Sequence, residues 1–141
     1  MFSQTAEYAL RAVVWLADHV DDGPAGHSVI AEDAKVPPTY LAKVLQSLAK
    51  AKIVSSRRGV GGGYTLNHDP SELTVLDVVN AVDPIKRIHG CPLKLASHGK
   101  KLCGMHSRLD NAVALVEVAL RESTIADILG ETSRPKPMVD R

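Results

Sequence analysis

The sequence has few cysteines, few aromatic residues and no long apolar run, and each shortage excludes a class of protein. Cys91 and Cys103 are the only cysteines, too few for the disulfide framework of a small secreted domain. No apolar run is long enough to cross a bilayer, and the amino terminus lacks the pattern of a secretory signal. We therefore expect a cytoplasmic protein without a membrane segment.

Aromatic side chains are scarce, since the 141 residues include one Trp, three Tyr and one Phe. The core must therefore be built mainly from Leu, Val, Ile and Ala, a composition that suits packed helices. The length fits a single domain with one additional helix, and it is sufficient to bury a core.

Acidic residues are absent from Lys35 to His68. That stretch holds six basic residues, so a whole-chain net charge of +1 leaves the other residues net acidic by five. Such a distribution is typical of proteins that bind the phosphate backbone of nucleic acid. Chance clustering on a solvated face is the alternative. The six basic residues are Lys35, Lys43, Lys50, Lys52, Arg57 and Arg58.

Three helices are predicted in the first part of the chain. Apolar residues recur at helical spacing over residues 5–19, and Ser28 can cap a short second helix over residues 28–34. Prolines 37 and 38 then impose a turn, because proline cannot occupy a helix interior but can begin a helix. The third helix should span residues 39–51, with a polar and basic face outward. Its buried stripe should comprise Leu41, Val44, Leu45 and Leu48.

This order of short helix, tight turn and longer helix is typical of a helix-turn-helix. Two β-prone runs, 53–55 and 64–66, follow directly and surround a glycine-rich turn, so they predict a hairpin. A hairpin in that position is the wing of a winged helix. The glycine cluster does not suit a nucleotide-binding loop, because no Lys-Ser/Thr follows it and Tyr64 interrupts the G-x-G-x-x-G spacing.

In this fold the third helix and the wing face double-stranded DNA. We expect Thr39, Tyr40 and Lys43 to lie closest to base edges and neighbouring phosphates, although Tyr40 could also pack in the core. The two wing arginines should contact the backbone or the minor groove. The residues predicted to contact DNA are Thr39, Tyr40, Lys43, Lys50, Arg57, Arg58, Gly59 and Gly61.

The second half of the chain predicts a loop between two further helices. Thr74 and Asp77 are spaced as a capping box for a helix that ends near residue 82. Residues 85–103 resemble a loop, and a long helix should follow over residues 105–121 with an apolar stripe along it. A second copy of the chain is the favoured partner for that stripe, and packing within one chain is the alternative.

The predicted fold class is mainly α: a winged helix-turn-helix with a two-stranded wing and a long C-terminal dimerisation helix. The predicted organisation is a winged helix-turn-helix domain over residues 1–82, a sensor loop over 83–104, a dimerisation helix and short terminal helix over 105–130, and a flexible tail over 131–141.

Two cysteines and a histidine near the predicted loop could hold a metal. Cys91, Cys103 and His106 form the pattern C-x11-C-x2-H, and His98 lies between the cysteines. Thiolates and imidazoles suit zinc or an iron–sulfur centre, and ordinary thiols beside solvated histidines are the alternative. The sequence shows no Ser-His-Asp arrangement, paired-carboxylate cleft or H-E-x-x-H motif, so we do not expect an enzyme.

Six stretches carry a family resemblance: EYALR (7–11), VPPTYL (36–41), IVSSRRG (53–59), GGGY (61–64) with Leu66, LTVLDV (73–78) and TIADIL (124–129). With these motifs the chain resembles the Rrf family of bacterial winged-helix regulators, which includes IscR, NsrR and RirA. The S-x-R-G-x-x-G-G-Y pattern of the wing is the specific part of the match. The resemblance covers nearly the whole chain and excludes only the tail.

The resemblance implies a homodimer, paired through the long helix, that binds imperfect palindromes in promoters. Many family members hold a [2Fe–2S] or [4Fe–4S] cluster and sense iron supply, nitric oxide or redox state. By this resemblance, Cys91 and Cys103 match the first and last of the family's three cysteines. His106 matches a histidine ligand of some members, and Glu7 matches a carboxylate that some members recruit from the partner subunit.

The chain departs from the family pattern where the middle cysteine is expected, since Ser97 stands there beside His98. Arg11 stands where one such member has a ligating histidine. A [4Fe–4S] cluster is therefore disfavoured, whereas a [2Fe–2S] cluster with nitrogen ligands suits a reversible redox switch. Its ligands would be Cys91, Cys103 and two of His98, His106 and Glu7. The alternatives are a DNA-binding regulator with a dithiol switch or zinc in place of the cluster, and a winged helix that binds protein.

Overall fold

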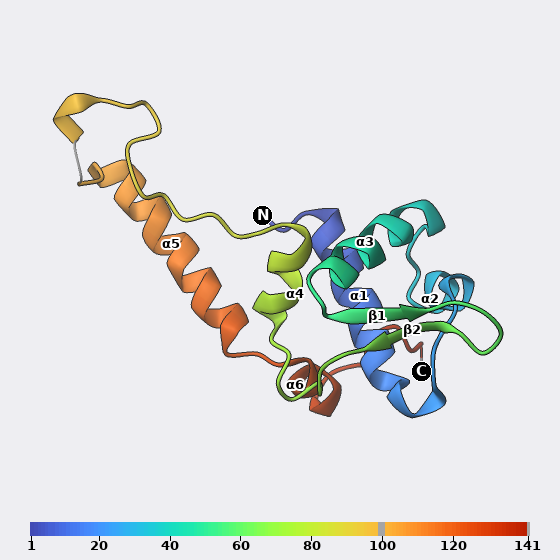
Figure 1. Ribbon diagram of the computed structural model, residues 1–141. Coiled ribbons are helices and arrows are strands. Elements are labelled where there is room, and N and C mark those ends of the chain that lie inside the picture. Colours follow the sequence, from blue (N-terminus) through green and yellow to red (C-terminus); the bar gives the residue numbers. More distant parts are fainter. Residues whose placement is uncertain (99–100, 141) are drawn as a thin grey trace.

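The protein is described here by a computed structural model that covers residues 1–98 and 101–140 (Figure 1). It is mainly helical with one two-stranded antiparallel sheet, which confirms the predicted winged-helix class. Its elements are α1 (Gln4–Asp18), η1 (Val20–Asp22), α2 (His27–Asp33), α3 (Pro38–Lys50), β1 (Val54–Arg57), β2 (Gly63–Leu66), α4 (Val75–Val82), η2 (Ala96–His98), α5 (Gly104–Arg121) and α6 (Ile125–Gly130).

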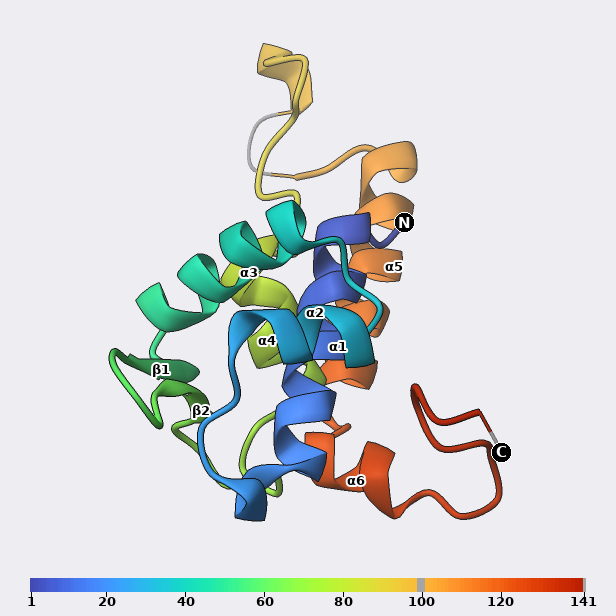
Figure 2. The same cartoon turned by 90° about the vertical axis from the view of Figure 1, so that its right-hand side faces the viewer.

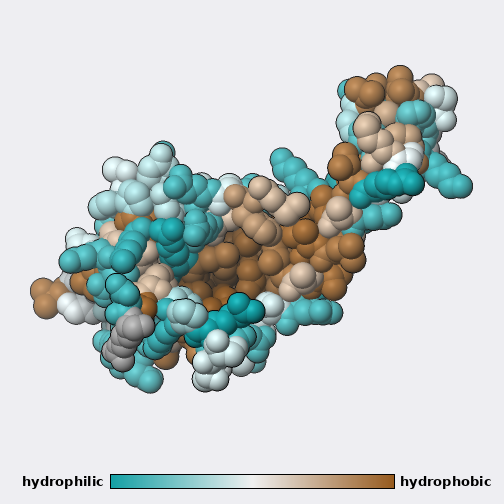
Figure 3. Space-filling view, turned by 180° about the vertical axis from the view of Figure 1, so that it is seen from behind, coloured by the Kyte–Doolittle hydropathy of each residue, from teal (hydrophilic) through white to brown (hydrophobic). Residues whose placement is uncertain are grey.

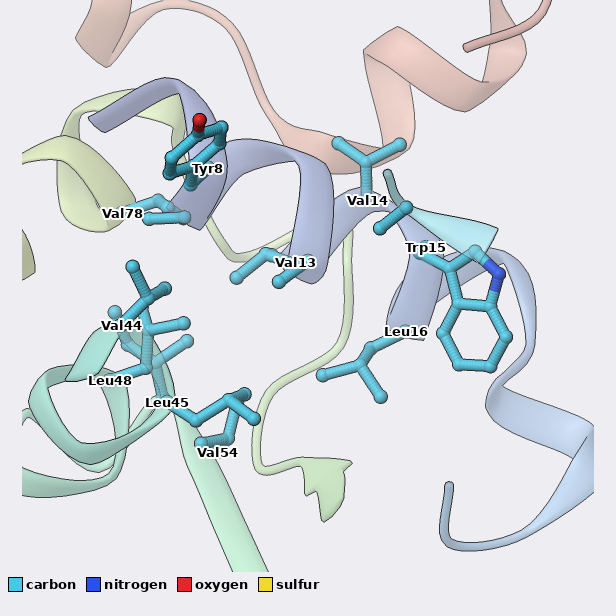
Figure 4. Packing of buried hydrophobic residues seen from close by; sticks show 14 of the residues in the cluster. Tyr8, Val13, Val14, Trp15, Leu16, Val44, Leu45, Leu48, Val54 and Val78 are labelled. Carbon is cyan, nitrogen blue, oxygen red and sulfur yellow. The ribbon is translucent and has the colours of Figure 1, made fainter. Parts of the chain in front are cut away.

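Helix α1 is the central element of the body, and α3, α4 and α6 pack around it. The Ser3 hydroxyl caps its first turn by accepting a hydrogen bond from the Ala6 N–H. The side chains of Val13 on α1 and of Leu45 on α3 point toward one another in the core (Figure 4). The predicted apolar stripe of α3 is confirmed, because Leu41, Val44, Leu45 and Leu48 are all buried.

The turn between α2 and α3 depends on proline and on one left-handed residue. Pro38 is the first residue of α3, where a missing N–H costs no intrahelical hydrogen bond. Lys35 has a φ of +56° and its carbonyl accepts a hydrogen bond of 2.9 Å from Arg11 Nη1 on α1. Ser28 was expected to cap α2, but the helix begins one residue earlier and Gly26 is its N-cap. The His27 ring contacts the Pro38 carbonyl at 2.9 Å, which ties this earlier start to α3.

The hairpin pairs Val54 with Leu66 and Arg57 with Gly63. Strand β1 therefore extends two residues beyond the predicted strand and includes Arg57, which the sequence placed in the turn. Gly63 has a φ of +143°, and a Cβ there would lie 2.5 Å from the Ala25 carbonyl oxygen. Two backbone hydrogen bonds between Ala25 and Tyr64 use this close approach to fasten the hairpin to the chain before α2.

Two similar capping boxes begin α4 and α6. Thr74 and Asp77 exchange hydrogen bonds at the start of α4, as predicted, and Thr124 and Asp127 do the same at α6. Ile125 of α6 is fully buried against the body. Helix α6 thus packs into the winged-helix core, although the sequence grouped it with the long helix.

Helix α5 and the loop before it form an arm that projects from the body (Figure 1). The loop is irregular apart from η2, and its residues 99–100 lie outside the described residues, as does Arg141 of the tail. The described part of the tail has no helix or strand, yet Lys136 forms an ion pair of 3.0 Å with Asp18 and Met138 packs against the core. Its mobility stays a prediction. Among the described helices, none is long and apolar enough to span a membrane.

Leu45 is expected to be a stability determinant because its side chain is fully buried between α3 and α1. Replacing it with alanine leaves a cavity, and we expect the free energy of unfolding to fall by about 3 kcal/mol in urea titrations. The matched variant Gln46→Ala, at the exposed neighbouring position, should change it by less than about 0.5 kcal/mol. Equal effects at the two positions would disprove the assigned orientation of α3.

Candidate nucleic-acid interface

The outer face of α3 is polar and basic. Thr39, Lys43 and Lys50 are exposed on the side opposite the buried apolar residues, and Tyr40 is exposed at the flank of the helix. No acidic residue interrupts this helix, so its charged side chains are all positive. The residues that the sequence predicted for DNA contact from α3 therefore have the exposure that such contact requires.

The side chain of Tyr40 is partly exposed to solvent and partly packed against α1. Its side chain is 51% exposed, and its ring lies 5.7 Å from that of Tyr8 on α1 at a tilted angle. Arg11 lies over the Tyr8 ring and forms an ion pair of 3.1 Å with Glu7. Tyr40 is thus supported by α1 through its ring. The phenolic end remains available at the surface.

The tip of the hairpin presents two arginines on a glycine turn. Arg57 and Arg58 are both exposed. Gly59 and Gly61 have φ values of +96° and +77°, and a Cβ at either position would meet open space. These two glycines permit the turn and leave the tip clear for a neighbouring backbone. Gly62, which sequence reasoning did not single out, is the crowded position, because a Cβ there would overlap the Arg57 carbonyl.

Helix α3 and the hairpin lie side by side. Helix α3 contacts β1, and both occupy the same side of the molecule in the two ribbon views (Figure 2). The exposed basic groups of α3 and the exposed wing arginines thus lie on two elements that contact one another. An elongated polyanion that contacts one of these elements can contact the other.

The predicted metal donors are only partly brought together. Cys103 Sγ and His106 Nδ1 are 3.4 Å apart, at the amino-terminal end of α5. Cys91 is half-buried in the loop, and His98 Nδ1 is buried with no hydrogen-bond partner among the described residues. Glu7 is paired with Arg11 on α1 instead.

Over residues 1–98 and 101–140, no three His, Cys, Asp or Glu side chains are arranged to hold a metal ion. The donors of one chain in this conformation therefore do not fit a [2Fe–2S] cluster, which needs four ligands.

One carboxylate on α5 holds the base of the loop. Asp110 accepts hydrogen bonds from Arg87 Nε and Nη2, both at 2.8 Å, and a third of 2.8 Å from the Ile88 N–H. We call this set of three hydrogen bonds the loop clamp. Glu117 lies 3.7 Å from Arg87 Nη1 and also pairs with Arg121. Sequence reasoning missed the loop clamp, since nothing in the sequence pairs Arg87 with a residue 23 positions away.

The loop clamp shifts the pKa of Asp110. Its hydrogen bonds from Arg87 and then from the Ile88 N–H lower the pKa of the carboxyl from 3.8 to about 2. Because the pKa in the folded state is lowered, the carboxylate contributes stability above pH 3.8, and this contribution is lost as the pH falls toward 2. We expect the thermal midpoint of Asp110→Asn to fall less than that of the native protein between pH 5 and pH 2. Parallel curves for the two proteins would show that Asp110 is not held as described.

Comparison with known proteins agrees with the resemblance found in the sequence. The family model described as Rrf2, iron-dependent transcriptional regulator, matches residues 2–131. The chain belongs to the Rrf2 family. This is a family of transcriptional regulators and not of enzymes.

Curated relatives agree over most of the chain. The HTH-type transcriptional regulator IscR of Yersinia pseudotuberculosis is 31% identical over 122 residues, which cover 86% of this chain and 74% of that protein. A regulator of Aquifex aeolicus, named an HTH-type transcriptional regulator, is 28% identical over 92% of this chain and 91% of its own length. DNA-binding regulation is thus supported at the level of the Rrf2 family.

Solved structures share the fold. IscR of T. potens has a TM-score of 0.78 and 26% identity, over 96% of this chain and 91% of that one. CymR, the global cysteine regulator of B. subtilis, has a TM-score of 0.74 and 23% identity, over 92% of this chain and 96% of that one. At that identity the likeness to CymR concerns the fold alone.

Proposed function

We propose that this Rrf2 protein is a homodimeric, sequence-specific regulator of transcription that binds a promoter palindrome through α3 and the hairpin. The observation that supports this most is that the lysines of α3 and the two arginines of the adjoining hairpin, Arg57 and Arg58, are all exposed, in a stretch without an acidic residue. Thr39, Tyr40 and Lys43 read base edges from the amino-terminal end of α3. The remaining predicted contacts, Lys50, Arg57, Arg58, Gly59 and Gly61, serve the phosphate backbone or the minor groove.

Helix α5 is the proposed dimer contact. None of its residues is fully buried, and Met105, Leu109, Leu115 and Val118 are each more than 40% exposed. Apolar side chains gather along this arm when the molecule is seen from behind (Figure 3). Such a surface on a regulator is typical of an interaction site.

A second copy of the chain is the occupant that suits this surface. A cavity of about 320 Å³ beside α5, lined by Phe2, Ile85 and Val113 among others, offers room for a partner's apolar side chain. A two-fold symmetric pair of winged helices matches a two-fold symmetric operator. The proposed dimer thus explains both the exposed apolar side chains of α5 and the projecting arm.

Cys91 and Cys103 are the proposed sensing residues, since the loop that carries them borders the proposed dimer helix. The contact between Cys103 and His106 supports a thiol site at the start of α5. Three forms of such a site are compatible with these residues: a dithiol, a zinc site and a [2Fe–2S] cluster. The cluster would need further donors that one chain in this conformation does not bring together. Anaerobic purification with iron, sulfide and zinc analysis tests for a metal: iron, sulfide and visible absorption mean a cluster, and stoichiometric zinc means a zinc site. A protein with neither metal has a dithiol or ordinary thiols, and formation of an intramolecular disulfide distinguishes these two.

Selection from random duplex DNA tests the proposed function. The full-length protein is bound to a library of duplexes, and the recovered sequences are compared. We expect an imperfect palindrome whose half-sites lie about 10 base pairs apart, or a multiple of that spacing. Recovery of no common sequence would mean that the winged helix serves another partner, such as a protein.

A further inference from the structure

The loop clamp lies on the face of α5 that also carries the thiol and the imidazole. Cys103, His106 and Asp110 follow one another at intervals of three and four residues, a spacing that places side chains on one face of a helix. The contact between Cys103 and His106 shows that this face is continuous at the start of α5. The base of the loop is therefore fastened to the same side of α5 on which the predicted donors stand.

Arg87 and Ile88 are the last polar anchors before Cys91. Among the described residues from His89 to His98, no hydrogen bond or ion pair reaches a residue outside the loop. The Asp110 side chain is only 13% exposed, and all three hydrogen bonds of the clamp end on it. A bidentate guanidinium–carboxylate pair fixes orientation as well as distance.

The loop from Arg87 to Cys91 and the part of α5 from Asp110 back to Cys103 have similar lengths. Cys91 follows Arg87 by four residues, which span about 13 Å when extended. Cys103 precedes Asp110 by seven residues of α5, a distance of about 10 Å along the helix. The loop runs along α5 toward the amino-terminal end of that helix (Figure 1). A loop fixed at Arg87 can thus bring Cys91 to the level of Cys103.

We propose that the loop clamp holds Cys91 within reach of Cys103 and His106, so that Arg87 and Asp110 are positioning residues of the thiol site. This inference rests on the proposed sensing role of the two cysteines and is independent of DNA binding. Without the clamp, Cys91 is tethered to Cys103 only through the eleven residues between them and through the released segment after α4. The two thiols then sample a larger volume, and their effective concentration falls.

Equilibration with glutathione measures that effective concentration. Cys91 and Cys103 lose two electrons and two protons to oxidised glutathione, which becomes two molecules of glutathione, as the intramolecular disulfide forms. The metal-free protein is used, and the oxidised fraction is determined by alkylation and mass spectrometry. We expect Arg87→Ala to lower the effective concentration of the thiol pair by about fivefold or more.

Matched variants separate positioning from general damage. Arg121→Ala removes the other arginine that pairs with Glu117 without touching Asp110, and it should keep the native equilibrium. Asp110→Asn, which retains an acceptor for the Ile88 N–H, should give an intermediate value and serves if Arg87→Ala does not fold. The proposal would be overturned if the effective concentration of the thiol pair in both Arg87→Ala and Asp110→Asn stayed within twofold of the native value. It would also be overturned if the native protein formed no intramolecular disulfide. DNA affinity of the reduced proteins, measured in parallel, reports separately on the proposed function.

Discussion

The double variant Arg57→Ala, Arg58→Ala is expected to bind operator DNA roughly 100-fold more weakly than the native protein at physiological salt. Both side chains are exposed at the hairpin, so their removal should leave the fold intact. Each phosphate contact contributes about 0.9 to the slope of log affinity against log salt. Removal of four arginines from a dimer should therefore make the slope less steep, by up to about 3.6 in magnitude. Fluorescence anisotropy over a range of salt concentrations measures both quantities.

The control for this variant removes two cations elsewhere on the surface. Arg134 and Lys136 are exposed in the tail and lie outside the acid-free stretch. Replacing both with alanine changes the net charge by the same amount, yet the salt slope should remain close to the native value. If the salt slope of the Arg57, Arg58 variant is unchanged, or if this variant and the control lose affinity equally, the hairpin does not contact DNA.

The double variant Leu109→Glu, Leu115→Glu is expected to be monomeric and to lose at least about 100-fold in operator affinity. The two leucines are 53% and 72% exposed on α5, so carboxylates at these positions are tolerated in one chain. At the interface of a second copy they would be desolvated and mutually repulsive. Dimerisation makes the second half-site contact intramolecular, which multiplies affinity by about 10² to 10⁴. Sedimentation velocity and DNA titration measure the two effects.

Added negative charge weakens DNA binding by itself, so the control must carry the same charge. The variant Gln4→Glu, Thr132→Glu adds two carboxylates at exposed positions outside α5. It should remain dimeric and lose much less affinity. If the leucine variant also remains dimeric, α5 is not the dimer contact and its exposed apolar side chains have another occupant.

Local sequence patterns predicted the body of the fold well. The spacing of Leu41, Val44, Leu45 and Leu48 predicted both the helix and its buried side, because helical periodicity depends only on neighbouring residues. The capping box at Thr74 was predicted for the same reason. Exposure of the DNA-contact candidates on α3 followed from the same periodicity.

Features that depend on contacts between distant segments were not predicted. Gly26 caps α2 in place of Ser28, since the His27 ring reaches the Pro38 carbonyl on the next helix. The tail of the chain lies on α1 through Lys136, although its composition suggested only mobility. Neither contact leaves a local pattern.

At the candidate thiol site, too, local features were predictable from the sequence and long-range contacts were not. The sequence singled out Cys91, Cys103 and His106 as candidate donors from their residue types and spacing, and their role stays a prediction. It could not identify the loop clamp, because Arg87 and Asp110 are ordinary surface residues until the chain folds. The pairing of Glu7 with Arg11, by contrast, is a local one, because the two residues are spaced i, i+4 in the predicted helix over residues 5–19.

Hydroxyl-radical footprinting on the selected operator, with the stoichiometry of the complex measured in parallel, tests the central claim most directly. The claim predicts two chains per duplex and protection that is symmetric about the centre of the palindrome. Each half-site should show protected sugars across a major groove, where α3 lies, and across the adjacent minor groove, where Arg57 and Arg58 lie. One chain per duplex, or protection without two-fold symmetry, would contradict the account.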